Sequence, residues 1–127
     1  PYDSSTSREF NWKMTPEELV IGIVGPCASG KSTLVSSLRL LGYQVRHIAQ
    51  EHSYVRDMWK QISNPDFLIY LDVTFEVSKD RTDSSWSRKI YENQVQRLEH
   101  ARIHADLFIQ TDELTPKQVL DFVLRNL

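Results

Sequence analysis

The apolar residues of the chain are concentrated in four short runs. These runs occupy residues 19–24 (LVIGIV), 43–49 (YQVRHIA), 67–73 (FLIYLDV) and 106–110 (DLFIQ). The first and third runs are apolar on both faces, which is typical of strands in a parallel sheet, because helices cover such a sheet on each side. The pattern therefore predicts four parallel strands.

Between these runs, apolar residues recur at helical spacing. Residues 31–41 predict a helix that ends at Gly42, with an apolar stripe of Leu34, Val35, Leu38 and Leu41. Residues 53–62 predict a short helix that stops before Asn64-Pro65, with an apolar stripe of Val55, Met58, Trp59 and Ile62. A long helix is expected over residues 87–105. A last helix begins at Thr115-Pro116, where Gln118 completes a capping box.

Strand and helix alternate four times, which predicts an α/β fold with a small, four-stranded parallel sheet and right-handed crossovers. We expect the strand order 2-1-3-4, with the first strand inside the sheet and helices on both faces. The fold occupies residues 15–127 as a single domain. The polar, serine-rich residues 1–14 precede it as an arm.

Composition and charge narrow the function classes. The 127 residues are 40% hydrophobic and carry a net charge of -2. Nucleic acids and anionic membrane surfaces attract basic faces, so this balance argues against both as partners. No apolar run reaches the length that spans a membrane, and the single cysteine, Cys27, allows no internal disulfide. We therefore expect a cytoplasmic protein.

One sequence motif indicates a binding function. The stretch GPCASGKST matches the phosphate-binding (Walker A) pattern G-x-x-x-x-G-K-[ST], directly after the first predicted strand and at the start of a predicted helix. Backbone N–H groups of such a loop can surround phosphate oxygens beside a helix N-terminus. We expect a nucleoside triphosphate, either ATP or another, to bind with Mg²⁺ at the nine residues of the motif: Gly25, Pro26, Cys27, Ala28, Ser29, Gly30, Lys31, Ser32 and Thr33.

Side chains in and beside this loop have separate expected roles. Lys31 reaches the β- and γ-phosphates, and the Ser32 hydroxyl can bind Mg²⁺. Cys27 is either a small side chain at a variable position or a thiol activated by the helix N-terminus and the lysine. Two acids follow predicted strands, Glu51 after the second and Asp72 at the end of the third, so either can reach the metal.

Three segments give the chain a resemblance to the P-loop small-molecule kinases, which include nucleoside, thymidylate and shikimate kinases. They are GPCASGKST, YLDVTFEVSKDR (residues 70–81) and ADLFIQTDELTPKQVLDFV (residues 105–123). The resemblance implies a three-layer P-loop NTPase fold and transfer of the γ-phosphoryl group to a small-molecule acceptor. Glu51-His52-Ser53 is similar to the Glu-Arg-Ser of nucleoside kinases, which implies that Glu51 is a catalytic base. Asp72 remains the alternative metal ligand.

The resemblance also implies a lid over residues 81–102. Arg81 and Arg88 lie near its start, where such kinases have arginines that contact phosphate or adenine. His100 and His104 have the spacing of metal ligands, but they point away from the apolar stripe and are expected to face solvent. The expected buried face of the lid consists of Tyr91, Val95, Leu98 and Ala105.

The sequence does not identify the phosphoryl acceptor, because the chain is short. The segment between the second and third strands is too short for the helical subdomain that holds the acceptor in these kinases. The first hypothesis is a kinase whose acceptor site is formed by residues 50–59, the lid or a second subunit of a homodimer. The second is a nucleotide-binding module or slow NTPase that acts through a partner. The third is an enzyme that cleaves pyrophosphate or triphosphate.

Overall fold

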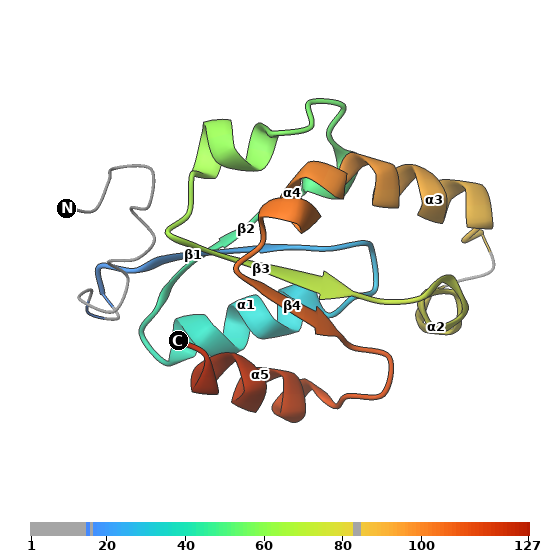
Figure 1. Ribbon diagram of the computed structural model, residues 1–127. Helices are drawn as coiled ribbons and strands as arrows, with labels where there is room; N and C mark the ends of the chain where they lie inside the picture. Colours follow the sequence, from blue (N-terminus) through green and yellow to red (C-terminus); the bar gives the residue numbers. More distant parts are fainter. Residues whose placement is uncertain (1–14, 16, 83–84) are drawn as a thin grey trace.

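A four-stranded, all-parallel sheet forms the centre of the molecule (Figure 1). The computed structural model describes residues 15, 17–82 and 85–127, so the predicted arm, residues 1–14, lies outside the described residues. The strands lie in the order β2-β1-β3-β4. Their bounds are β1 (Val20–Val24), β2 (Gln44–His47), β3 (Phe67–Asp72) and β4 (Leu107–Gln110). The predicted α/β fold, parallel sheet and strand order are therefore confirmed.

Helices cover both faces of this sheet. One face carries α1 (Lys31–Leu40) and α5 (Pro116–Arg125), and the other carries α4 (Glu99–His104), while α3 (Arg88–Arg97) lies against η2 (Gln50–His52) at the carboxyl ends of the strands (Figure 1). The pleat of the strands divides the core accordingly, since successive side chains point to opposite faces. In β3, Ile69 and Leu71 pack in the cluster that contains α1 and α5, whereas Leu68 and Tyr70 pack in the cluster on the other face.

The carboxyl ends of the four strands meet at one edge of the sheet. The connections that leave this edge are the glycine loop (residues 25–33) after β1, the 3-10 turn η2 (Gln50–His52) after β2, and α2 (Phe75–Arg81) after β3. Thr111 follows β4, and its N–H donates to the Asp72 carbonyl at 2.9 Å. In open parallel sheets this edge is where ligands bind.

The predicted helix over residues 53–62 is confirmed only in part, because residues 53–57 form no helix. The chain makes turns there and then a π-helix, η3 (Trp59–Ser63). Trp59 is buried as expected, but Val55 is 50% and Ile62 76% exposed. The buried Gln50 side chain explains the difference, because it accepts the Trp59 N–H at 2.9 Å and donates to the Val55 carbonyl at 2.8 Å. These side-chain bonds hold residues 53–57 in a loop ahead of η3.

The lid sequence also departs from the single helix that its pattern predicts. It contains α3 and α4, with a bend at Leu98, whose N–H bonds to the carbonyls of both Gln94 and Val95. Leu98 is fully buried as expected, and Gln94 is buried beside it, whereas Val95 is only partly buried. The helix α2 has no counterpart in the prediction. Its N-terminus is capped by Thr74, whose hydroxyl accepts the Val77 N–H.

The expectation that His100 faces solvent is wrong as well. Its Nδ1 accepts the indole N–H of the buried Trp59 at 3.0 Å. His104 is exposed, and its ring stacks on that of His100 with 4.3 Å between the ring centres. His100 therefore satisfies the polar atom of a core tryptophan, which helical spacing alone does not reveal.

Candidate functional site

The glycine loop turns sharply between the end of β1 and the start of α1. Gly25 and Gly30 have φ angles of 156° and 99°, which residues with a side chain rarely adopt. A Cβ at Gly25 would also overlap the backbone carbonyl of Leu71 in β3. Packing and backbone conformation both require glycine at Gly25, and backbone conformation requires it at Gly30.

Backbone donors collect where this loop meets α1. The helix begins at Lys31, and Gly30 gives its N-terminus no side-chain cap. The first amides of a helix have no acceptor within the helix, so the N–H groups of Lys31, Ser32 and Thr33 have no acceptor in α1 and can bind an anion. The helix dipole adds partial positive charge at the same point. The Ser32 and Thr33 side chains are exposed there.

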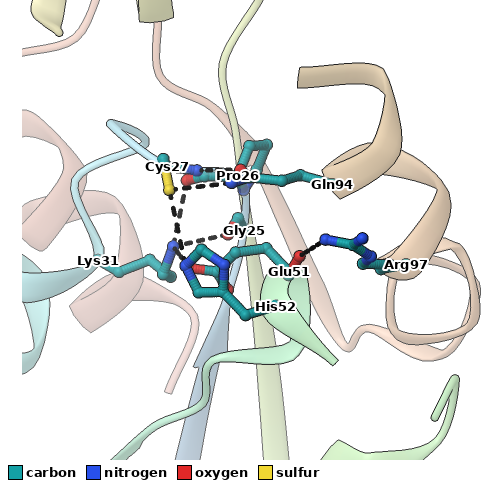
Figure 2. A network of polar contacts seen from close by, with 8 residues as sticks. All are labelled: Gly25, Pro26, Cys27, Lys31, Glu51, His52, Gln94 and Arg97. Atoms are coloured by element: carbon teal, nitrogen blue, oxygen red, sulfur yellow. Dashed lines mark hydrogen bonds and ion pairs between the residues drawn. The ribbon is translucent and has the colours of Figure 1, made fainter. Parts of the chain in front are cut away.

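The Lys31 side chain is folded back onto the loop (Figure 2). Its ammonium group donates to the carbonyls of Gly25 at 2.6 Å and Pro26 at 3.1 Å and forms an ion pair with Glu51 at 2.9 Å. The two ionic side chains are only 7% and 6% exposed. The positive charge also acts on the end of β2: burial lowers the pKa of His47, and Lys31 lowers it further.

Glu51 and His52, both in η2, approach the loop from the β2 side (Figure 2). The Nε2 atom of His52 lies 3.7 Å from Glu51 Oε2 and 3.9 Å from Cys27 Sγ. Within the described chain, Ser29 Oγ and Glu51 Oε1 are buried and have no hydrogen-bond partner. Buried polar atoms normally have partners, so these two oxygens are candidates for contact with a ligand.

The helix α3 holds both the loop and η2 (Figure 2). Gln94 accepts the Cys27 N–H at 2.9 Å, and its Nε2 donates to Cys27 Sγ at 3.2 Å. Arg97 donates to the Glu51 carbonyl at 3.3 Å, and its guanidinium lies 4.5 Å from the centre of the Tyr54 ring. The lid sequence therefore supplies an amide and a guanidinium to the site.

A pocket of about 320 Å³ adjoins the glycine loop. Arg81, the last residue of α2, forms one wall and donates to the carbonyls of Ala28 at 2.9 Å and Thr111 at 3.1 Å. The apolar part of the wall consists of Leu34, Leu114, Pro116 and Val119. A mostly apolar pocket with a few polar groups in its wall is typical of small-molecule sites.

Two of the predicted residues have their contacts elsewhere. Asp72 faces Gln110 and Asp112, and partial burial raises the pKa of its carboxyl, with a further contribution from Asp112. Arg88 forms an ion pair with Glu76 at 3.3 Å and lies over the Phe75 ring. Within the described residues, no hydrogen bond or ion pair joins Asp72 or Arg88 to the side chains of the glycine loop.

Three residues of the site are absent from the predicted set: Gln94, Arg97 and Thr111. Thr111 directly follows β4, so the rule that parallel strands end at one edge could have identified it. Gln94 is a polar residue within the apolar stripe of a predicted helix, which is a weaker signal. Arg97 has no sequence signal, because its role depends on how α3 packs against η2.

Comparison with known proteins returns no matching family model and no matching curated protein. In the part of the chain that the structure describes, no helix is long and apolar enough to cross a membrane.

Proposed function

We propose that the glycine loop binds the phosphates of a nucleoside triphosphate, ATP with Mg²⁺, and that the protein transfers the γ-phosphoryl group to a small-molecule acceptor. One observation carries this proposal. The buried Lys31 ammonium group lies beside the uncapped N-terminus of α1 and 2.9 Å from Glu51. A positive charge, amide donors and an acid around one point are the groups that phosphoryl transfer requires.

Phosphate oxygens would accept hydrogen bonds from the backbone N–H groups at the start of α1 and from the Lys31 ammonium group. Lys31 now bonds to two loop carbonyls, which are weaker acceptors than an ionised phosphate. A bound triphosphate would therefore draw the ammonium group away from Glu51. The exposed Ser32 hydroxyl is suited to hold Mg²⁺, which supplies charge neutralisation at the phosphate oxygens. Asp72 is less suited to this role because its carboxylate faces Gln110.

The pocket beside Arg81 supports the nucleotide part of the proposal. It is mostly apolar and adjoins the loop at Ala28, Ser29 and Gly30. A nucleobase is flat and apolar on its faces, and an arginine guanidinium can stack on it. We assign the base to this pocket and the phosphates to the loop.

Glu51 is the proposed general base. Its Oε1 atom has no partner among the described residues, and release of Lys31 would free the carboxylate to accept a proton. The acceptor oxygen then bonds to the γ-phosphorus, the bond to the nucleoside diphosphate breaks, and Glu51 takes the hydroxyl proton. A hollow beside η2 is the proposed acceptor site, and its arginines favour an anionic acceptor. It is lined by Tyr54, Arg56, Asn93, Gln96 and Arg97.

The short connection between β2 and β3 favours a second candidate, nucleotide binding without efficient transfer. This connection contains η2, turns and η3. It leaves Tyr54, Arg56 and the acceptor hollow exposed. Transfer to an acceptor requires that water is excluded from the reacting groups. A nucleotide-binding module that acts through a partner, or that hydrolyses the nucleotide slowly, does not need to exclude water from the site.

Calorimetric titration of two variants with MgATP tests nucleotide binding. Glu51→Gln keeps Lys31 and removes the buried anion. Adding Lys31→Met to Glu51→Gln then removes the ammonium group without leaving a carboxylate unpaired. We expect the double variant to bind MgATP about tenfold or more weakly than Glu51→Gln alone, because hydrogen bonds to charged groups contribute about 1.5–3 kcal/mol. Equal affinity in the two variants contradicts the proposal.

A further inference from the structure

Three metal-binding side chains meet at the edge of the glycine loop: Cys27, Glu51 and His52 (Figure 2). Their ligand atoms all lie within 4.8 Å of one another. Neighbouring ligand atoms in a tetrahedral zinc site are about 3.3–3.6 Å apart, as follows from metal–ligand distances of about 2.0–2.3 Å. His52 Nε2 is already 3.7 Å from Glu51 Oε2 and 3.9 Å from Cys27 Sγ. Because the His52 side chain is 60% exposed, it can rotate toward both partners. Cys27 Sγ and the Glu51 carboxylate, which lie within 4.8 Å of each other, must also move closer to share an ion.

We propose that these three residues bind a thiophilic divalent ion, Zn²⁺, with water as the fourth ligand. A thiolate, an imidazole and a carboxylate are all ligands that Zn²⁺ accepts. Mg²⁺ takes oxygen ligands and avoids thiolate. The site is therefore separate in chemistry from the Mg²⁺ proposed at Ser32. It does not depend on the proposed phosphoryl transfer, and it is exclusive with that reaction, because Glu51 cannot bind the ion and act as the general base at the same time.

Two further observations point to a ligand here. The Glu51 side chain is 6% exposed, and its Oε1 atom has no hydrogen-bond partner among the described residues. A metal ion bound by the Glu51 carboxylate would supply the partner that this buried oxygen lacks. Gln94 supplies the second observation, because its Nε2 donates to Cys27 Sγ at 3.2 Å. Such an outer hydrogen bond orients a ligating thiolate and stabilises its negative charge.

Lys31 opposes the metal ion at this site. Its ammonium group lies 2.9 Å from the same carboxylate, so the ion and the lysine repel each other and compete for Glu51. A bound ion therefore favours the state in which Lys31 has turned to other acceptors. If the loop binds phosphates as proposed above, the ion and the nucleotide act on the same lysine.

Titration of the nucleotide-free, reduced protein with Co²⁺ tests the site, since Co²⁺ replaces Zn²⁺ and absorbs light. We expect a thiolate-to-cobalt charge-transfer band that Zn²⁺ abolishes. Cys27→Ser should remove the band, and His52→Gln should weaken Co²⁺ binding at least tenfold. Circular dichroism of each variant checks that the fold is retained. His104→Gln is the matched control, because His104 and His100 form the rival histidine pair.

Each alternative outcome overturns the proposal. A spectrum without the thiolate band excludes Cys27 as a ligand. Unchanged Co²⁺ affinity in His52→Gln excludes the three-residue set. Loss of Co²⁺ binding in His104→Gln assigns the ion to His100 and His104. We expect Co²⁺ binding to require Cys27 and His52 and to be unchanged in His104→Gln.

Discussion

The Lys31 ammonium group lies 2.9 Å from the Glu51 carboxylate, with both side chains almost fully buried. This contact joins the first turn of α1 to η2, and the whole of β2 lies between them in the sequence. Either charge alone at such a position would lower the stability of the fold, because it would lose its hydration without compensation. The glycine loop and η2 are therefore coupled at one ion pair, and any ligand that attracts Lys31 also changes the state of Glu51.

The first prediction concerns the stability of this pair. Lys31→Met leaves a buried, unpaired carboxylate and should lower the free energy of unfolding by about 3 kcal/mol, the lower end for a broken buried pair. Adding Glu51→Leu removes the stranded charge and should recover most of the loss. Urea denaturation of the single and double variants measures both values. If the two variants are equally unstable, the pair is not coupled.

Turnover should depend on Glu51 more than on Asp72. With an acceptor that supports release of ADP, Glu51→Gln should retain MgATP binding and lose about 100-fold or more in kcat, as expected for a lost general base. Asp72→Asn is the matched acidic control, and its kcat should change by less than the loss in Glu51→Gln. A large loss of Mg²⁺-dependent binding in Asp72→Asn would instead make Asp72 the metal ligand.

The two predicted lid arginines should behave differently. Arg81 bonds to the carbonyls of Ala28 and Thr111 at the pocket, whereas Arg88 contacts Glu76 and Phe75. Arg81→Ala should weaken MgATP binding about tenfold, since charged contacts contribute at least about 1.5 kcal/mol. Arg88→Ala should leave the affinity close to that of the unmodified protein. Calorimetry on both variants compares them directly, and equal losses would argue against the pocket as the base site.

Gln94 should control access to the Cys27 thiol. It bonds to both the Cys27 N–H and Sγ, so Gln94→Ala should loosen the loop and accelerate alkylation of the thiol by iodoacetamide several-fold. Gln96→Ala, an exposed position on the same helix, is the control and should leave the rate unchanged. Bound MgATP should slow the reaction in the unmodified protein. If ATP binds without any effect on the rate, Cys27 is remote from the nucleotide.

Asp72 should make stability fall as pH rises. Burial raises the pKa of its carboxyl in the folded state above the ordinary value of 3.8. The folded protein therefore holds this proton more tightly than the unfolded chain, and the ionisation of Asp72 costs stability as pH rises above 3.8. Asp72→Asn should raise the melting temperature at neutral pH, and the gain should disappear below that value. Asp121→Asn, which replaces an exposed carboxylate of α5, is the surface control.

The sequence by itself determined the features that local pattern encodes. Four apolar runs specified the strands, and glycines at Gly25 and Gly30 with Lys31 specified the loop and the start of α1. The capping box at Thr115 specified the start of α5. These features depend on neighbours in the chain, such as a steric limit on φ or a side chain that bonds three residues away. They can therefore be recognised without knowledge of the rest of the molecule.

The tertiary structure alone decided which side chains share the site. Gln50 holds residues 53–57 in a loop ahead of η3, because its buried amide bonds to Val55 and Trp59. Gln94 and Arg97 reached the loop and η2 because α3 packs across the carboxyl edge of the sheet. Glu51 rather than Asp72 met Lys31, since the direction of a side chain at a strand end depends on the path of the connection that follows. Such contacts join distant parts of the chain, so no local pattern records them.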